Sequence, residues 1–314
     1  MEFRGSDIIS VNQFDLGDIN TLFALAHRLR KIATGELKCK ILDGFILGNL
    51  FFEASTRSRM SFASAFMRLG GQVNSTTGVA FSSMSKGETL ADTISVIQSY
   101  CDILAIRHPQ LGAAQEAARA SKVPVINAGD GPGEHPTQAL LDLFTIFEER
   151  KQIHNSTIAM VGDLKYGRTV HSLAKLLTLY QGIRYIFVAP SQVQMPDGLV
   201  EELKAKGYNV SQTDKLEEGI RDANVIYSTR IQEERFDRRE EYEAIKNVYV
   251  LDREMVLRTC NPDVTILHPL PRTTEIAVDV DALPNAAYFR QSANGLMIRM
   301  ALFLLILGKE QELV

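Results

Sequence analysis

The sequence predicts an α/β protein of two domains, each with a parallel sheet flanked by helices. Short apolar runs rich in β-branched residues alternate with amphipathic runs, which is the pattern of βαβ units. The alternation occurs as two successive series, and 314 residues correspond to two domains at about 150 residues each. The composition, 45% hydrophobic and 23% charged, is that of a globular protein and excludes disordered, collagen-like and coiled-coil chains.

The first series predicts a sheet and its helices in the N-terminal half. The strand candidates are apolar runs at residues 45–51, 103–106 and 123–127. The helix candidates, in which apolar residues recur at helical spacing, are residues 12–34, 58–69, 89–100 and 112–121. Residues 136–150 carry apolar side chains along one face, so we predict a helix there that links the two halves.

The second series predicts another sheet. Its strand candidates are residues 158–161, 185–188, 225–228 and 264–267. Its helix candidates are residues 168–180, 198–206 and 215–222. Residues 291–307 form one more apolar-periodic segment, and periodicity does not say on which domain it packs. Residues 232–243 are dense in charges of both signs, which is typical of a solvated loop or helix face, although a loop that closes over a ligand has the same composition.

Charge and cysteine content restrict the partners. Lys and Arg number 34 against 38 Asp and Glu, so the net charge of −4 disfavours a nucleic-acid-binding protein but allows a local cationic site. The three cysteines are far apart and form no CxxC motif, which predicts free thiols in a reducing, cytoplasmic setting. The longest apolar run, residues 300–307, is far shorter than the roughly 20 residues that span a bilayer, so we expect a buried helix and no membrane partner.

A polar segment follows the first strand candidate at the point where a helix begins. Ser55, Thr56, Arg57 and Ser58 combine hydroxyl groups and a guanidinium with the free N–H groups of a helix start, which together suit a phosphate. Simple N-capping by a serine or threonine is the alternative interpretation. The segment by itself does not separate the two.

Three further segments of the first half carry polar side chains at loop positions. Ser82 and Lys86 lie in a polar loop before a helix, which is weak evidence alone. Arg107 ends a buried strand, where ligands sit in open α/β sheets. His135 and Gln138 follow a glycine-rich turn and can donate hydrogen bonds to a ligand, although a lone histidine near a helix start is more often a capping residue.

The second half repeats this arrangement. Arg168, and Arg230 with Gln232, follow predicted strands, and the segment that contains Pro269 and Leu270 follows another. The simplest physical account is one anionic ligand in each half, meeting at a cleft. A dinucleotide site is disfavoured because G-x-G-x-x-G is absent, and the chain has neither HxxxH metal spacing nor a G-x-S-x-G elbow.

Seven segments, taken in order, resemble the aspartate/ornithine carbamoyltransferase family. They are FFEASTRSR, KGETLADTIS, RHP, HPTQALLDLF, MVGDLKYGRTVHSL, STRIQ and LHPLPR, and the match covers nearly the whole chain. Ornithine-specific members typically have H-C-L-P where this chain has His268-Pro269-Leu270-Pro271, and they lack a lysine before G-E. Lys86 and Pro269 therefore favour the catalytic chains of the aspartate-specific members. A carbamoyltransferase for another amino acid, such as ornithine, and a catalytically silent assembling homologue are the alternatives.

The resemblance implies a domain organisation and an assembly. Residues 1–136 and 292–314 would form a carbamoyl-phosphate-binding domain, and residues 137–291 an L-aspartate-binding domain. It further implies a homotrimer in which the loop of Ser82 and Lys86 enters the site of the neighbouring chain. The resemblance allows regulatory chains or a dihydroorotase to attach to this trimer. It implies no cofactor and no metal.

Residue roles also come from the resemblance. Residues 55–58 and Ser82 would hold the phosphate, and Arg107 would bridge the phosphate and the carbonyl oxygen, to which His135 also donates. Gln138 and the carbonyls of Pro269 and Leu270 would hold the carbamoyl NH2. The residues implied to bind aspartate are Lys86, Arg168, Arg230, Gln232 and Leu270. The residues implied to act in catalysis are Arg57, Ser58, Lys86, Arg107 and His135.

The implied chemistry is direct attack of the aspartate α-amino group on the carbamoyl carbon through a tetrahedral intermediate. One position departs from the family pattern: the phosphate motif usually ends S-T-R-T, and this chain has Ser58. The hydroxyl is retained and the methyl group is lost, so the side chain is less restricted. By its family position, Glu53 would pair with Arg168 and Arg235 across the cleft.

Overall fold

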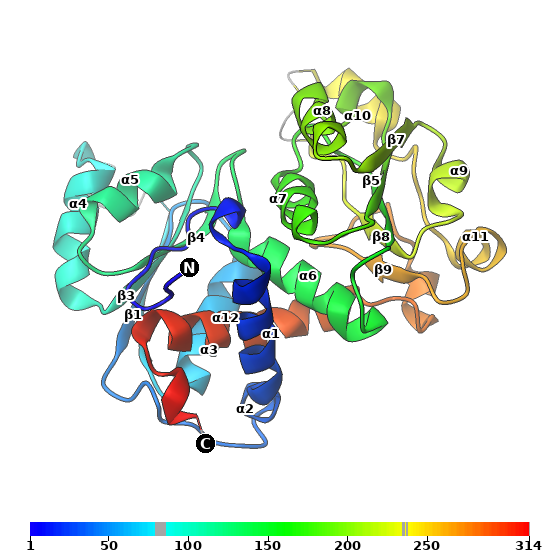
Figure 1. The fold of residues 1–314 in the computed structure, drawn as a ribbon. Helices are drawn as coiled ribbons and strands as arrows, with labels where there is room; N and C mark the ends of the chain where they lie inside the picture. The colour runs from blue at the N-terminus through cyan, green and yellow to red at the C-terminus, as the bar shows by residue number, and fades with distance from the viewer. Residues whose placement is uncertain (79–85, 234–235, 237, 314) are drawn as a thin grey trace. The chain divides into compact units, whose positions relative to one another are not determined.

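The computed structural model describes residues 1–78, 86–233, 236 and 238–313. They form two compact units, which we call unit 1 (Met1–Leu141 with Ala293–Val314) and unit 2 (Asp142–Ser292). Figure 1 shows the elements of both units. The division falls inside two helices, α6 (Pro136–Arg150) and α12 (Tyr288–Leu307), each of which contributes residues to both units. The domain boundaries predicted from the sequence fall between residues 136 and 137 and between residues 291 and 292.

Unit 1 contains a parallel sheet in the order β2-β1-β3-β4. Its strands are β1 (Ile46–Phe51), β2 (Gln72–Thr77), β3 (Ile103–His108) and β4 (Val125–Asp130). Its other helices are α1 (Leu16–Arg28), α2 (Arg30–Thr34), α3 (Thr56–Arg68), α4 (Leu90–Ile97) and α5 (Ala113–Ala120). Short 3-10 turns occur at Val11–Gln13, Gln98–Tyr100 and Glu310–Glu312.

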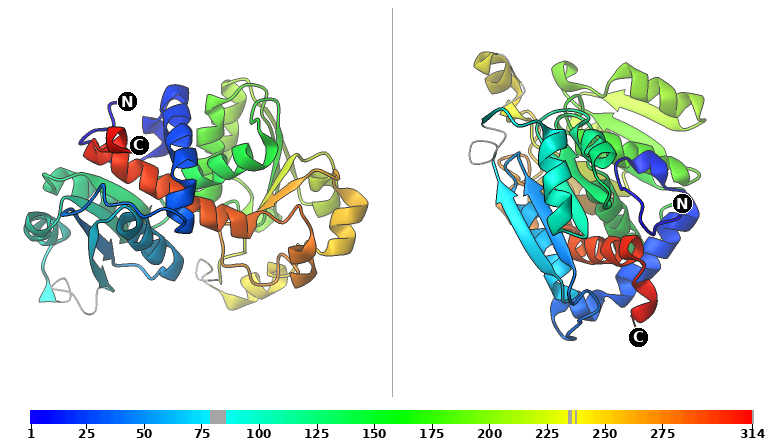
Figure 2. Two further views of the ribbon diagram at one scale, coloured as in Figure 1. Left: turned by 90° about the horizontal axis from the view of Figure 1, so that it is seen from below. Right: turned by 90° about the vertical axis from the view of Figure 1, so that its left-hand side faces the viewer.

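Helices cover both faces of this sheet because successive strand residues point to opposite sides. Leu50 packs with Ile94 and Ala117, so α4 and α5 lie on one face. Phe51 contacts Phe62 of α3 on the other face, where Phe303 of α12 also contacts Phe62 at a centroid distance of 6.1 Å. Figure 2 shows the C-terminal part of α12, in red, beside α1 in dark blue.

Unit 2 contains a parallel sheet in the order β7-β6-β5-β8-β9. Its strands are β5 (Thr157–Val161), β6 (Arg184–Val188), β7 (Asn209–Thr213), β8 (Val225–Ser228) and β9 (Thr265–Leu267). Its other helices are α7 (Arg168–Leu176), α8 (Asp197–Ala205), α9 (Leu216–Ile220), α10 (Arg239–Ile245) and α11 (Arg253–Thr259). Its 3-10 turns are Leu177–Leu179, Ser191–Val193 and Val278–Ala282.

The predicted α/β class is confirmed, with every predicted strand present, and two strands were missed. The missed strands, β2 and β7, are the polar segments QVNSTT and NVSQT, and each is an outer strand of its sheet. An edge strand is partly solvated and often polar, so it lacks the apolar run by which buried strands are recognised. Strand prediction from apolar runs therefore found only the interior strands and β4 and β9.

One predicted helix was wrong in its extent. Residues 12–34 were expected to form a single helix, whereas α1 begins only after Asp15 and ends before Leu29, where α2 follows. Asp15 accepts a hydrogen bond from the N–H of Asp18, and Asp18 accepts one from the N–H of Asp15, so a capping box fixes the start of α1. The apolar periodicity of the stretch conceals this boundary.

The apolar run 300–307 lies in α12, and Met300, Leu302 and Leu304 are fully buried in unit 1. This confirms the predicted buried helix. Among the helices that the structure describes, none is long and apolar enough to cross a membrane.

Candidate functional site

In unit 1, the predicted anion-binding residues follow the carboxyl ends of three adjacent strands. Residues 55–58 come after β1, Arg107 is the last residue but one of β3, and His135 follows β4. Phe51 pairs with Arg107 and His108 pairs with Asp130, so the three strand ends lie at the same edge of the sheet. Parallel α/β sheets bind ligands at this edge, and unit 1 therefore brings these predicted residues together.

The segment 55–58 forms the N-terminus of α3. Ser55 occupies the N-cap position with extended backbone, but its side chain makes no capping hydrogen bond, so its hydroxyl is not used in the way that the N-capping alternative requires. Thr56 and Arg57 are exposed, and Ser58 is half-buried in the first helical turn. The first turn of a helix presents N–H groups and a partial positive charge, which favour an anion.

Arg107 is held in a fixed position at the end of β3. Its Nη2 lies 2.9 Å from Oε1 of Glu53, and its Nη1 donates to the carbonyl oxygen of Ala128 at 3.3 Å. The residue is only 9% exposed. A guanidinium restrained in this way keeps its direction without reorganisation when a ligand arrives.

The loop between β4 and α6 places His135. Asp130 accepts hydrogen bonds from the N–H of Glu134 within the loop and from the N–H of Gly112, which directly precedes α5. His135 is buried and occupies the position before α6, where its carbonyl accepts from the N–H groups of Gln138 and Ala139. Gln138 follows one turn later and is half-buried. His135 thus caps α6 through its backbone while its side chain belongs to the predicted site.

The loop of Ser82 and Lys86 is only partly described. Ser82 lies outside the described residues, and Lys86 is exposed just before the N-terminus of α4. Thr89 caps that helix by accepting a hydrogen bond from the N–H of Asp92.

In unit 2, the predicted residues again follow three adjacent parallel strands. Tyr227 of β8 pairs with Met160 of β5 and with Leu267 of β9. Counting three residues onward from each of these positions gives Asp163, Arg230 and Leu270, so these three residues leave the sheet at the same edge. Arg168 begins α7, which follows β5. Unit 2 thus contains the residues expected to bind aspartate apart from Lys86, which lies in unit 1.

Asp163 anchors Gln232, a contact that sequence reasoning missed. Oδ2 of Asp163 accepts from the backbone N–H and from Nε2 of Gln232 at 3.4 and 3.3 Å, and Oδ1 accepts from the N–H of Tyr166. Burial raises the pKa of Asp163, and these donors oppose that rise. Asp163 lies two residues after Val161, the last residue of β5, and an acid at that position is the sequence signal that could have identified it.

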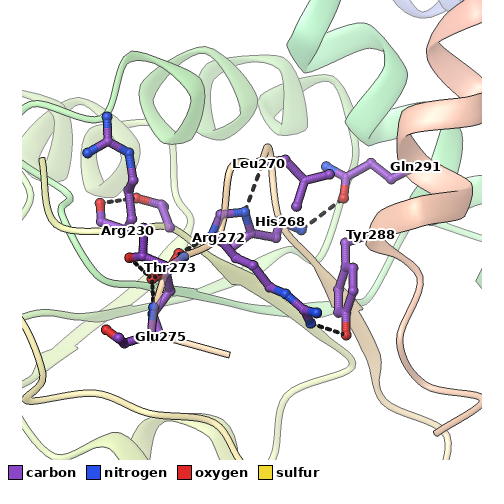
Figure 3. Close-up of polar contacts among 10 residues, drawn as sticks. Arg230, His268, Leu270, Arg272, Thr273, Glu275, Tyr288 and Gln291 are labelled. Carbon is purple, nitrogen blue, oxygen red and sulfur yellow. Dashed lines mark hydrogen bonds and ion pairs between the residues drawn. The ribbon is translucent and has the colours of Figure 1, made fainter. Parts of the chain in front are cut away.

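The turn that contains Pro269 and Leu270 follows β9. Leu270 has φ of 57°, in the left-handed region that leucine rarely adopts, and the Leu270–Pro271 peptide bond is cis. The N–H of Leu270 donates to Nδ1 of His268 at 2.8 Å, as Figure 3 shows. The hydrogen bond to His268 therefore fixes the direction of the Leu270 N–H.

Glu275 is a second residue that sequence reasoning missed. Its carboxylate contacts Nε2 of His268 at 2.7 Å and accepts from Oγ1 and N–H of Thr273 and from the N–H of Thr274. Burial alone would raise the pKa of Glu275, but the hydrogen bonds from His268 and Thr273 override it and lower the pKa. Thr273 and Glu275 lie beneath the turn in Figure 3.

This pKa predicts a pH-dependent contribution to stability. A carboxylate whose pKa is depressed on folding stabilises the protein above its unfolded pKa and loses that contribution as the pH falls through the folded pKa. The free energy of unfolding of the native chain should therefore exceed that of Glu275→Gln at pH 7, and the difference should shrink as the pH falls below 4.5. Urea unfolding of both proteins across this range measures the difference. A difference that does not change with pH would contradict the assignment.

Glu53 has a partner other than the two expected from its family position. It contacts Arg107 within unit 1, and Arg235 lies outside the described residues.

In the charged stretch 232–243, residues 239–243 belong to α10, while 234, 235 and 237 are outside the description. Within the described ranges, no group of three or more His, Cys, Asp or Glu side chains could hold a metal ion.

Comparison with protein-family models gives two adjacent matches. Residues 6–148 match the aspartate/ornithine carbamoyltransferase carbamoyl-P binding domain, and residues 154–306 match the Asp/Orn binding domain of the same family. The second match extends into the part of α12 that belongs to unit 1.

Individual relatives agree with these matches. The chain is 47% identical to the aspartate carbamoyltransferase catalytic subunit of Cellvibrio japonicus, over 98% of this chain and 94% of that protein. The crystal structure of aspartate transcarbamoylase from Trypanosoma cruzi in complex with N-(phosphonacetyl)-L-aspartic acid superimposes with a TM-score of 0.90 at 43% identity, covering 97% of each chain. The chain is also 46% identical to a segment of the multifunctional protein CAD of Squalus acanthias, over 98% of this chain and 14% of that protein.

Proposed function

The chain belongs to the aspartate/ornithine carbamoyltransferase family, and we propose that it transfers the carbamoyl group of carbamoyl phosphate to the α-amino group of L-aspartate. The products are N-carbamoyl-L-aspartate and phosphate, in an early step of de novo pyrimidine biosynthesis. One observation carries the proposal: each unit gathers arginines at the carboxyl edge of its sheet, Arg57 and Arg107 in unit 1 and Arg168 and Arg230 in unit 2. Two anionic substrates explain two such sites.

We assign the phosphate and the carbonyl oxygen of carbamoyl phosphate to unit 1. Residues 55–58 supply helix N–H groups, hydroxyls and a guanidinium to the phosphate. Arg107 donates to both the phosphate and the carbonyl oxygen, and His135 donates to the carbonyl oxygen. Gln138 and the backbone carbonyls of Pro269 and Leu270 hold the carbamoyl NH2. The family match of residues 6–148 supports this assignment.

We assign L-aspartate to unit 2. The substrate carries two carboxylates, and an arginine fork binds a carboxylate through two parallel hydrogen bonds. Arg168, Arg230 and Gln232 supply these donors, and Gln232 is oriented by Asp163. Lys86 completes the set from a neighbouring chain. Pro269 and Lys86 occur where aspartate-specific members have them, which favours aspartate over ornithine.

The reaction is a nucleophilic substitution at the carbamoyl carbon. The uncharged α-amino group attacks this carbon, and the negative charge of the tetrahedral intermediate develops on the former carbonyl oxygen. Donors already directed at that oxygen lower the barrier, and one such donor is worth about 2.7–4 kcal/mol in other enzymes. Arg107, His135 and Ser58 are the donors here. Collapse of the intermediate breaks the bond to the phosphate oxygen, and inorganic phosphate leaves.

A colorimetric assay for carbamoyl-aspartate tests the function, with ornithine as a parallel acceptor. We expect product from aspartate and none from ornithine. Product from ornithine alone would identify a different carbamoyltransferase, and no product from either acceptor would identify a catalytically silent homologue.

We further propose a homotrimer with shared sites, in which Ser82 and Lys86 act in the neighbouring chain's site. Lys86→Ala and Arg107→Ala trimers should each be inactive. After equimolar subunit exchange, about a quarter of the sites should combine an intact Arg107 with an intact Lys86, so activity should recover to about that fraction.

Mixing Arg57→Ala with Arg107→Ala provides the matched control. Both residues lie in unit 1 of one chain, so exchange cannot rebuild an intact site and activity should stay absent. Native mass measurement confirms that exchange has occurred. No recovery in the Lys86 and Arg107 mixture after verified exchange would contradict shared sites.

We propose a cytoplasmic location as well. Cys39, Cys101 and Cys260 are all free. Free thiols are typical of a reducing compartment and support this proposal.

A further inference from the structure

His268 uses its backbone N–H and both ring nitrogens within the protein interior. Its backbone N–H donates to Oε1 of Gln291 at 2.8 Å, its Nδ1 accepts from the N–H of Leu270 at 2.8 Å, and its Nε2 lies 2.7 Å from Oε1 of Glu275. The residue is 2% exposed. Figure 3 shows it between Gln291 on one side and Leu270 on the other.

These contacts determine the state of the imidazole. A nitrogen that accepts a hydrogen bond from a backbone N–H carries no proton, so Nδ1 is the unprotonated nitrogen. The ring proton is therefore on Nε2, which donates to the Glu275 carboxylate. His268 is consequently neutral and its ring has a fixed orientation. Nδ1 faces the Leu270 turn and Nε2 faces away from it.

The turn at Leu270 needs a contact such as the hydrogen bond to Nδ1 of His268. Leu270 has φ of 57°, a conformation in which the Cβ of an L-residue crowds its own backbone. Backbone in such a region persists only where its surroundings hold it, and the hydrogen bond to Nδ1 holds the Leu270 N–H. The direction of this N–H fixes the plane of the Pro269–Leu270 peptide, and with it the Pro269 carbonyl.

The position of His268 is itself secured by a buried network. Nε2 of Gln291 donates to Oδ1 of Asp142 at 2.6 Å, and the hydroxyl of Tyr227 donates to Oδ2 of Asp142 at 2.7 Å. Glu275 holds the other side of the ring and is itself fixed by Thr273. Buried networks whose members have partners are rigid.

We propose that His268 is a positioning residue for the carbamoyl group: its Nδ1 fixes the Leu270 turn so that the Pro269 and Leu270 carbonyls accept the hydrogen bonds of the carbamoyl NH2. The inference rests on the proposed function. Sequence reasoning assigned the two carbonyls to this task through family resemblance and gave no role to His268 or Glu275.

Two substitutions separate the two contacts of the ring. His268→Asn places an amide oxygen near the position of Nδ1, so it keeps the acceptor for Leu270 and loses the contact with Glu275. His268→Gln places an amide NH2 near the position of Nε2, so it keeps the contact with Glu275 and loses the acceptor. We expect His268→Gln to lower kcat/KM for carbamoyl phosphate about 100-fold, the effect of a misplacement of about 1 Å. His268→Asn should lose less than about tenfold, the effect of one neutral hydrogen bond.

The matched control is His154→Gln. Nδ1 of His154 also accepts a backbone N–H, from Gln181 at 3.1 Å, but this exposed residue lies outside the proposed site. Its replacement removes the same kind of hydrogen bond and should leave kcat/KM unchanged.

Competitive inhibition by inorganic phosphate distinguishes positioning from general damage, because phosphate has no carbamoyl NH2. Its inhibition constant should stay the same in both His268 variants. Equal losses of kcat/KM in the Asn and Gln variants, a parallel rise in the phosphate inhibition constant, or failure of both variants to fold would each overturn the inference. If only His268→Gln fails to fold, a 100-fold loss in folded His268→Asn overturns it. An inactive native enzyme would instead contradict the proposed function.

Discussion

Replacing Arg107 with alanine should lower kcat about 10²–10³-fold, the loss measured when one donor to a developing oxyanion is removed from other enzymes. Arg107 is the group for which the structure gives the clearest evidence of preorganisation, since Glu53 and the Ala128 carbonyl fix its guanidinium at the end of β3. Steady-state kinetics with saturating substrates measure the effect.

Two further variants make this result specific. Arg119→Ala removes an exposed arginine of α5 in the same unit and should leave kcat unchanged. Because Arg107→Ala also removes a partner of Glu53, the double variant Arg107→Ala/Glu53→Gln should show the same loss as the single variant. A kcat within threefold of native in folded Arg107→Ala would contradict the role of Arg107 in transition-state stabilisation.

The second large effect is expected at Arg230. Its replacement by alanine should raise KM for aspartate about 100-fold, because hydrogen bonds between charged groups are worth about 1.5–3 kcal/mol each and an arginine fork makes two. KM for carbamoyl phosphate should change little, since Arg230 is not among the residues assigned to that substrate. Initial-rate measurements with each substrate varied in turn separate the two constants.

Arg221→Ala is the matched control for this variant. Arg221 is exposed just after α9 of the same unit, so its loss should leave both constants unchanged. A rise of KM for carbamoyl phosphate equal to the rise for aspartate in Arg230→Ala would contradict the assignment of aspartate to unit 2.

Sequence predicted most of the fold because most of its strands are buried. The runs at β1, β3, β5, β6 and β8 are almost wholly apolar, so their positions and their class were both correct. The polar edge strands β2 and β7 give no such signal. The break at Leu29 was also missed, because both α1 and α2 continue one apolar periodicity.

The residues of the candidate site also fall into those that sequence reveals and those that it does not. Arginines at strand ends, such as Arg107 and Arg230, can be found from sequence because a cation at or near the carboxyl end of a buried strand is conspicuous. The residues that orient these arginines, or the turns beside them, cannot be found from sequence. Glu53 meets Arg107 across 54 positions of sequence, and Gln291 meets His268 across 23, so only the folded chain shows these contacts.

The central claim is that the two arginine sets act on one pair of substrates, and titration calorimetry with N-(phosphonacetyl)-L-aspartic acid tests it most directly. This compound, bound in the related Trypanosoma cruzi structure, joins a phosphonate to an aspartate in one molecule. We predict that native protein binds one molecule per chain and that Arg107→Ala and Arg230→Ala each weaken binding at least about 100-fold, since each loses charge-assisted hydrogen bonds. Native affinity in either folded variant would contradict the claim.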